Sequence, residues 1–114
     1  MKKQHTRPCR ECPFRRVAAA GWLGGFTADE FRHLADADRR MPCHMHMKDG
    51  VDYANPGKAP QCAGRAIHWA NRFKTPRDRS LGLLQLPQDT VLVFQWPQEF
   101  VDHHKAGLLA EVRK

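Results

Sequence analysis

The sequence predicts a small α+β domain, stabilised by a metal, with three to four short helices and little sheet. The chain has 114 residues, which is enough for one domain whose core is small and often needs added support. Several stretches have helical spacing of apolar residues, and one short stretch is rich in β-branched and aromatic residues. Four cysteines fall in three short sequence words, which suggests that a metal supplies the support.

Residues 1–8 are predicted to form a flexible basic arm, and residues 9–114 a single metal-binding domain. No apolar run approaches the roughly 20 residues of a membrane span, and the first residues lack the apolar stretch of a signal peptide. We therefore expect a cytoplasmic protein with no membrane partner. In a reducing cytosol, four cysteines favour metal binding or redox chemistry over disulfides. The oligomeric state cannot be predicted from the sequence.

The first helix is predicted to begin directly after Thr27 and to end near Arg39. Thr27 and Glu30 have the spacing of a capping box, in which each side chain bonds the other's backbone N–H. Phe26 and Phe31 have the spacing of a hydrophobic staple, which fixes how the chain enters the helix. The face expected to be buried comprises Phe31, Leu34 and Ala35.

Residues 41–47 alternate in character and are predicted to be extended. Methionines and Cys43 occupy one side of this stretch, while Pro42, His44 and His46 occupy the other. We therefore expect Cys43 to point inward and the two histidines outward. Residues 48–60 are rich in turn-forming residues and are predicted to be a loop.

Residues 61–74 are predicted to form an amphipathic helix with a basic face. The basic stripe comprises Arg65, His68 and Arg72. The stripe expected to be buried comprises Ala63, Ala66, Ile67, Ala70 and Phe73. Pro76 follows, and it suits the first turn of a further short helix that we expect to reach Leu84.

Residues 90–96 are the best strand candidate because they combine β-branched and aromatic residues. Pro97 ends this stretch. The remaining residues, 97–114, are predicted to be mostly helical. The apolar residues available for burial in this last helix are Phe100, Val101, Leu108, Leu109 and Val112.

The four cysteines are predicted to bind one metal. Cys9 and Cys12 have the two-residue spacing that lets one tight turn present both sulfurs, and the arginines around them favour the thiolate form. Cys43 and Cys62 can supply the other two corners of a tetrahedron. Four thiolates would close the site and make it structural. Unligated or disulfide-forming cysteines are the alternative.

Zinc is the expected metal because it is the commonest occupant of four-cysteine sites. An iron–sulfur cluster is the alternative, since Pro13, Ala63 and Gly64 leave little side-chain bulk beside the cysteines. Histidine could also replace a cysteine or support one from behind. The histidines considered for such a supporting or ligating role are His44, His46 and His68.

Three sequence words, Cys-x-x-Cys-Pro-Phe-Arg, Pro-Cys-His and Cys-Ala-Gly, occur in this order. They resemble those of a family of short uncharacterised proteins from bacteria and tailed phages. The resemblance covers about residues 7–75. It implies that one site contains Cys9, Cys12, Cys43, His44 and Cys62, and it implies no activity. A phage-encoded protein of this kind would be expected to act on a host factor.

The positive charge is concentrated in two segments of the chain. The formal net charge is +7, and residues 1–16 and 61–79 carry the excess. Such clustering indicates a polyanionic partner, with nucleic acid as the first candidate. Metal ligation would bring the two segments together into one surface. The candidate nucleic-acid-binding residues are Arg7, Arg10, Arg15, Arg16, Arg65, Arg72, Lys74, Arg77 and Arg79.

Three other functions are compatible with the sequence. An iron–sulfur protein could act in redox chemistry or sensing, and a basic interaction module could inhibit a host protein. A metal-dependent nuclease could use His44, His46 or the pair His103 and His104. A site closed by four thiolates has no open position for substrate, so we do not expect an enzyme and assign no catalytic residue. Trp22 or Trp69 could stack on a base if exposed, but core packing is the stronger expectation.

Overall fold

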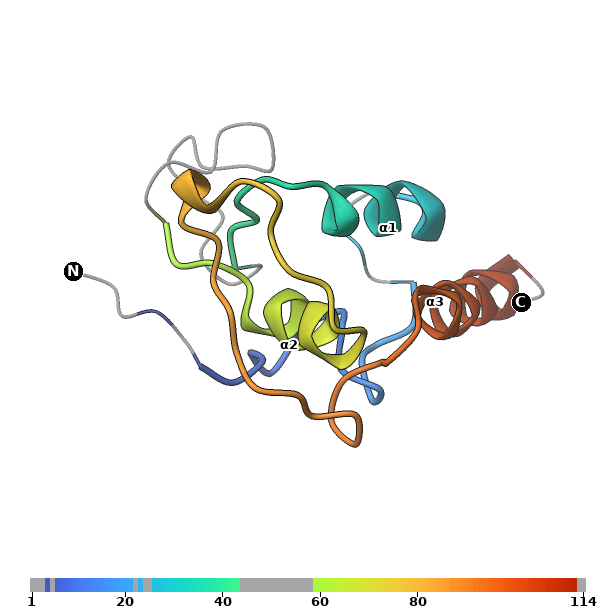
Figure 1. Cartoon of the computed structure of the whole chain (residues 1–114). Helices are drawn as coiled ribbons and strands as arrows, with labels where there is room; N and C mark the ends of the chain where they lie inside the picture. The colour runs from blue at the N-terminus through green and yellow to red at the C-terminus, as the bar shows by residue number, and fades with distance from the viewer. Residues whose placement is uncertain (1–3, 5, 22, 24–25, 44–58, 113–114) are drawn as a thin grey trace.

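A computed structural model describes residue 4 and residues 6–21, 23, 26–43 and 59–112, with side chains described as far as Ala106. In these residues the chain forms three α-helices, α1 (Ala28–Asp36), α2 (Ala63–Asn71) and α3 (Pro97–Val112), and one 3₁₀ turn, η2 (Arg79–Leu81). Figure 1 shows α2 at the centre, α1 above it and α3 to one side, with long connections wrapped around α2. None of the described helices is long and apolar enough to span a membrane.

The prediction of an α+β fold is wrong, because the described residues are helical and form no sheet. Their only extended pairings are two isolated antiparallel bridges, Arg15 with Val93 and Pro42 with Gln61. The expected strand at residues 90–96 begins as a turn, in which the backbone of Asp89 accepts the N–H of Val93. Strand propensity reflects packing on a sheet, and no neighbouring strand is present here for these residues to join.

Helix α1 confirms the predicted N-terminal signals. The Thr27 hydroxyl accepts the Glu30 N–H at 3.1 Å, and the Glu30 carboxylate accepts the Thr27 N–H at 2.9 Å. The rings of Phe26 and Phe31 lie 6.3 Å apart, as a hydrophobic staple requires. The helix nevertheless ends at Asp36, earlier than the predicted end near Arg39.

The early end of α1 has its cause in α2. The guanidinium of Arg65 donates to the carbonyls of Ala35, at 2.8 Å, and of Arg39, at 2.6 Å, and it also donates to Ala37. Trp69 supports this arrangement, because its indole N–H bonds the Ala35 carbonyl at 2.7 Å and its ring lies 4.4 Å from the guanidinium. One buried side chain therefore satisfies several carbonyls at and beyond the helix end.

The prediction that α2 carries a basic face is also wrong. Every residue of α2 except Ala70 is buried, and Arg65 is only 5% exposed. His68 uses Nδ1 to bond the Phe94 carbonyl at 2.6 Å, and burial lowers the pKa of His68 to about 4. Arg72, just beyond the helix, pairs with Asp36 at 2.8 Å. Four of its nine residues are alanine or glycine, which lets other segments approach the helix closely.

The C-terminal end of α2 also differs from the prediction. The helix ends at Asn71 rather than near residue 74, and Phe73, which was expected to be buried, is 83% exposed. The short helix expected to follow Pro76 and reach Leu84 is reduced to η2, a single 3₁₀ turn.

Three phenylalanines from distant parts of the chain form the centre of the core. Phe14 lies 5.7 Å from Phe31 of α1 and 5.2 Å from Phe100 of α3, measured between ring centroids. The rings of Phe31 and Phe100 are 5.7 Å apart and stacked. His104 ties the same region together, because it accepts the Gly21 N–H and bonds the Pro13 carbonyl. The N-terminal loop is thereby fixed between α1 and α3.

We expect Arg65→Met to lower the free energy of unfolding by about 3 kcal/mol, because it leaves buried carbonyls without donors. Urea unfolding monitored by circular dichroism measures the change. Arg40→Met is the matched control, since among the described residues Arg40 donates one long bond, 3.4 Å, to the Gly82 carbonyl; this substitution should cost about 1 kcal/mol or less. Equal effects of the two substitutions would contradict the role assigned to Arg65.

Candidate metal centre

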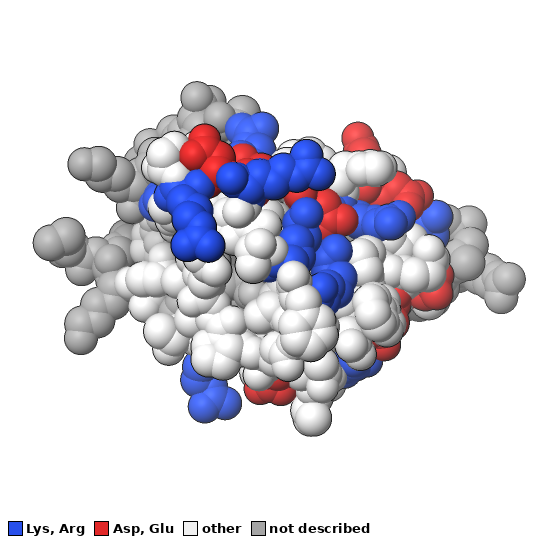
Figure 2. Space-filling model, in the orientation of Figure 1, with Lys and Arg blue, Asp and Glu red and all other residues white. Residues whose placement is uncertain are grey.

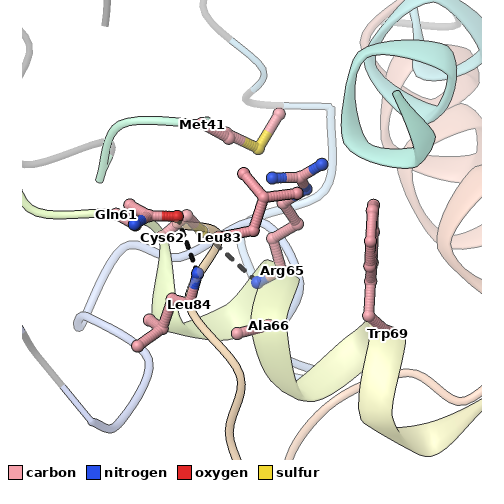
Figure 3. Close-up of a pocket in the computed structure, with 8 residues that line it drawn as sticks. All are labelled: Met41, Gln61, Cys62, Arg65, Ala66, Trp69, Leu83 and Leu84. Atoms are coloured by element: carbon pink, nitrogen blue, oxygen red, sulfur yellow. Dashed lines mark hydrogen bonds between the residues drawn. The ribbon is translucent and has the colours of Figure 1, made fainter. Parts of the chain in front are cut away.

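Cys62 occupies the N-cap position of α2. Its sulfur accepts the N–H of Arg65 at 3.4 Å, which takes the place of the oxygen cap found at most helix starts. Figure 3 shows this bond and the Arg65 side chain running from the first turn of α2 towards the end of α1. The positive end of a helix dipole favours a thiolate, so the position of Cys62 suits an anionic sulfur.

Cys12 lies against the same helix start. Its Sγ is 3.9 Å from the Sγ of Cys62, and both residues are buried. A Cβ atom at position 64 would collide with the Cys12 sulfur, so only glycine permits this approach. The hydrogen bond from the Cys12 thiol lowers the pKa of Cys62 and raises the pKa of Cys12. Of the two buried sulfurs in contact, Cys62 therefore has the lower pKa.

The other two cysteines approach from separate segments. In the turn that contains Cys9, the Cys12 N–H donates to the Cys9 carbonyl at 3.0 Å, and a side-chain hydrogen bond with Cys9 further raises the pKa of Cys12. Cys43 is buried and donates its N–H to the Pro60 carbonyl, while Cys62 donates to Met41. Alternation along this short antiparallel pairing places Cys43 and Cys62 on one side of it as diagonal neighbours.

The positions of the four cysteines match a tetrahedral four-thiolate site in part. With Zn–S bonds of about 2.3 Å, two sulfurs on one tetrahedral zinc are about 3.8 Å apart, which is close to the separation of Cys12 and Cys62. All four cysteines are free of disulfides. As the described side chains stand, however, no group of three or more His, Cys, Asp or Glu residues is arranged to hold a metal ion. Cys12 and Cys62 thus fit one edge of such a site, and a metal would have to draw Cys9 and Cys43 in.

The three histidines considered near the cysteines differ in their placement. Nδ1 of His68 bonds the Phe94 carbonyl at 2.6 Å, so this nitrogen is not available to a metal, and the His68 ring lies 5.6 Å from that of Phe14. His44 and His46 lie outside the described residues. His103 and His104, considered for a nuclease, bond the backbone carbonyls of Ala18 and Pro13. Both therefore hold the N-terminal loop.

Several of the candidate nucleic-acid-binding arginines have internal partners. Arg65 and Arg72 bind the end of α1, as described above. Arg16 pairs with Glu99 at 2.9 Å and donates to the Thr90 carbonyl at 2.8 Å. Arg15 donates to the Arg10 carbonyl at 3.3 Å. The expected surface made from the N-terminal arginines together with Arg65 and Arg72 does not form, because these guanidinium groups are used in different parts of the fold.

A different basic surface is formed where the segment after α1 meets the segment around η2. The Asp38 carboxylate accepts the backbone N–H groups of Arg77 and Asp78, and Arg40 donates to the Gly82 carbonyl. Figure 2 shows basic side chains gathered over the upper half of this face, with carboxylates among them, and a largely uncharged lower half. We call the following residues the basic cluster: Arg39, Arg40, Lys74, Arg77 and Arg79.

Sequence reasoning placed Lys74, Arg77 and Arg79 among the candidates but missed Arg39 and Arg40. Both lie in the segment that follows α1, and Arg39 was considered only as the expected end of that helix. The sequence feature that could have indicated them is Asp38. A carboxylate near the C-terminal end of a helix opposes the helix dipole, so it is expected to accept N–H groups from another segment of the chain. Arg7 and Arg10 are exposed in the N-terminal loop.

The sequence matches no protein-family model, and neither curated proteins nor solved structures give a significant match. The geometry of the cysteines and of the basic cluster is therefore the basis for a functional assignment.

We expect Gly64→Ala to destabilise the protein by about 1–3 kcal/mol, because the added Cβ would displace the Cys12 sulfur. Propensity alone predicts the opposite, since alanine in a helix interior is favoured over glycine by about 0.5–1 kcal/mol. Ala70→Gly, at the one position of α2 that is not buried, is the control and should cost about 1 kcal/mol. Urea unfolding of the three proteins measures both effects. A stabilising Gly64→Ala would contradict the close approach of Cys12.

Proposed function

We propose that this chain is a small nucleic-acid-binding module whose N-terminal loop is joined to α2 by a metal ion bound to Cys9, Cys12, Cys43 and Cys62. The observation that carries the nucleic-acid assignment is the junction at Asp38, which places the cations that follow α1 beside those of the η2 segment. The observation that carries the metal is the 3.9 Å approach of the Cys12 and Cys62 sulfurs.

The charges around the basic cluster favour a polyanion. Residues 36–40 and 72–79 contain six basic and three acidic side chains, which leaves an excess of three positive charges. The carboxylates are already used: Asp36 pairs with Arg72, Asp38 binds backbone N–H groups, and Asp78 binds Ser80. Arg77 and Arg79 of the cluster are exposed to solvent, as phosphate contacts require.

A single metal atom suits the cysteine geometry better than a cubane cluster. In a four-iron cluster each cysteine binds a different iron, so the sulfurs are separated by the width of the cluster, whereas sulfurs 3.9 Å apart can bind the same atom. We therefore propose zinc. A bound zinc would cross-link the N-terminal loop, the segment of Cys43 and the start of α2. The free energy of zinc binding would then contribute directly to the stability of the fold.

The arrangement gives no support to catalysis at the cysteines. The pocket beside Cys62 has a volume of about 10 Å³, which is room for about one water molecule. Its walls include Met41, Leu83 and Trp69 together with Arg65, and they leave no room for a substrate beside Cys62. A structural metal suits such a site.

A protein-interaction role is the alternative to be tested against nucleic-acid binding.

Protein purified anaerobically should contain one zinc per chain and no visible colour, as measured by elemental analysis and absorption spectroscopy. Cys12→Ala should lose the zinc and unfold, because metal binding and folding are coupled. Met41→Leu is the control: it changes a buried sulfur-containing neighbour of Cys62, should keep the zinc and should cost less than about 1.5 kcal/mol. A finding of iron with acid-labile sulfide would show that the site holds an iron–sulfur cluster instead of zinc. A wild-type protein that is folded without metal would contradict the proposed metal site.

The double variant Arg77→Gln, Arg79→Gln should bind DNA and RNA more weakly and lower the salt slope by up to about two units, since each lost phosphate contact removes about one. Its thermal stability should be unchanged, because both side chains are exposed. Lys105→Gln, an exposed cation of α3 paired with Asp29, is the control and should leave the slope unchanged. Fluorescence anisotropy at several salt concentrations measures the slopes. Equal slopes for the double variant and the wild type would contradict the basic cluster as the binding surface.

A further inference from the structure

Phe73 has a backbone conformation that its residue type rarely adopts. Its φ of +57° lies in the left-handed region, and it is the sole non-glycine residue with a positive φ in the described part of the chain. This conformation ends α2: the Phe73 N–H donates to Ala70 at 3.0 Å, and the Lys74 N–H donates to Trp69 at 2.9 Å. Glycine is the usual residue at this position of a helix end, because a Cβ atom is strained there.

Packing does not explain why a phenylalanine occupies this position. The ring of Phe73 is 83% exposed, so it contributes little to the core, while its backbone is less stable than a glycine would be. Strained residues of this kind are characteristic of functional positions rather than of stabilising ones. Here the strain fixes where an exposed aromatic ring stands relative to the end of α2.

A hollow with an apolar floor lies beside this ring. It has a volume of about 230 Å³, and Phe73, Lys74, Trp69 and Leu86 are among the residues that line it. This volume is below that of most small-molecule pockets, so it suits one planar ring rather than a larger ligand. The Lys74 ammonium stands 4.6 Å from the centre of the Trp69 ring, at the side of the hollow. A flat aromatic group on Phe73 would therefore have a cation next to it.

The sequence places further cations directly after the ring. Lys74, Arg77 and Arg79 of the basic cluster follow Phe73 within six residues, and the last two are exposed to solvent. An exposed aromatic ring with basic side chains spaced along the adjoining chain is the arrangement by which proteins bind single strands, with bases stacked on the ring and phosphates on the cations.

We infer that Phe73 is a stacking residue for a base of single-stranded nucleic acid, with Lys74, Arg77 and Arg79 binding the neighbouring phosphates. This inference rests on the proposed nucleic-acid function and specifies its substrate class. Duplex bases are stacked on one another and are not available to Phe73, so single strands bind more tightly than duplexes of the same length.

The test compares wild-type protein, Phe73→Gly, Phe73→Trp and Val91→Ala in binding to a labelled oligothymidine and to a duplex. Phe73→Gly should bind the single strand about tenfold more weakly. Its melting temperature should be equal to or higher than that of the wild type, because glycine relieves the strained backbone. Phe73→Trp should retain binding. Val91→Ala, which removes an apolar side chain that is 86% exposed and lies outside the basic cluster, should change neither property.

The outcomes separate this inference from the function on which it rests. Wild-type affinity for the single strand, together with weak binding by a fully folded Phe73→Gly, supports both. Equal binding by wild type and Phe73→Gly overturns the stacking role and leaves the basic cluster as the binding surface. Duplex binding as tight as single-strand binding overturns the substrate class. Absence of wild-type binding to either nucleic acid at low salt overturns both the function and the inference, in favour of a protein partner.

Discussion

The contact between the Cys12 sulfur and the start of α2 is the constraint on which the rest of the structure depends. It exists because position 64 has no side chain, and it fixes the N-terminal loop against the central helix. Phe14, two residues after Cys12, is then placed against both Phe31 and Phe100, so the core of α1 and α3 includes a residue supplied by the loop. The described residues, which form no sheet, thus acquire a defined centre from one close approach, and a metal at the sulfurs would hold that approach in place.

Arg65 shows how a charged residue can act as a part of the core. Burial lowers the pKa of Arg65 to about 10, which still leaves it charged at neutral pH, and its donors are matched by carbonyls at the end of α1. The negative end of the α1 dipole also favours a cation there. The same residue donates its backbone N–H to Cys62, so the end of one helix and the sulfur at the start of another are joined through it.

Sequence reasoning succeeded where an interaction is local and failed where the partner is far along the chain. The capping box and staple of α1 involve residues within a few positions of one another, so their spacing alone predicts them. Arg65 was assigned to a solvent-facing stripe because its partners lie 26 to 30 residues away. Residues 90–96 have strand propensity, but the part of the chain that the structure describes offers them no adjacent strand, only the single bridge of Val93 with Arg15. Cys9, Cys12, Cys43 and Cys62 were chosen by motif, and whether they share a metal depends on the spatial arrangement of three segments.

Helix α2 connects the proposed metal site at the cysteines to the proposed stacking residue Phe73. Its nine residues span about 13 Å, with the cysteines at its first turn and Phe73 just beyond its last. The Cys12 contact holds the start of the helix, and burial along almost its whole length holds the rest, so the ring at its end has a fixed place relative to the core. If the proposed metal and the fold are coupled, loss of the metal would abolish nucleic-acid binding together with the fold, whereas a change at Phe73 would weaken binding with both the metal and the fold retained.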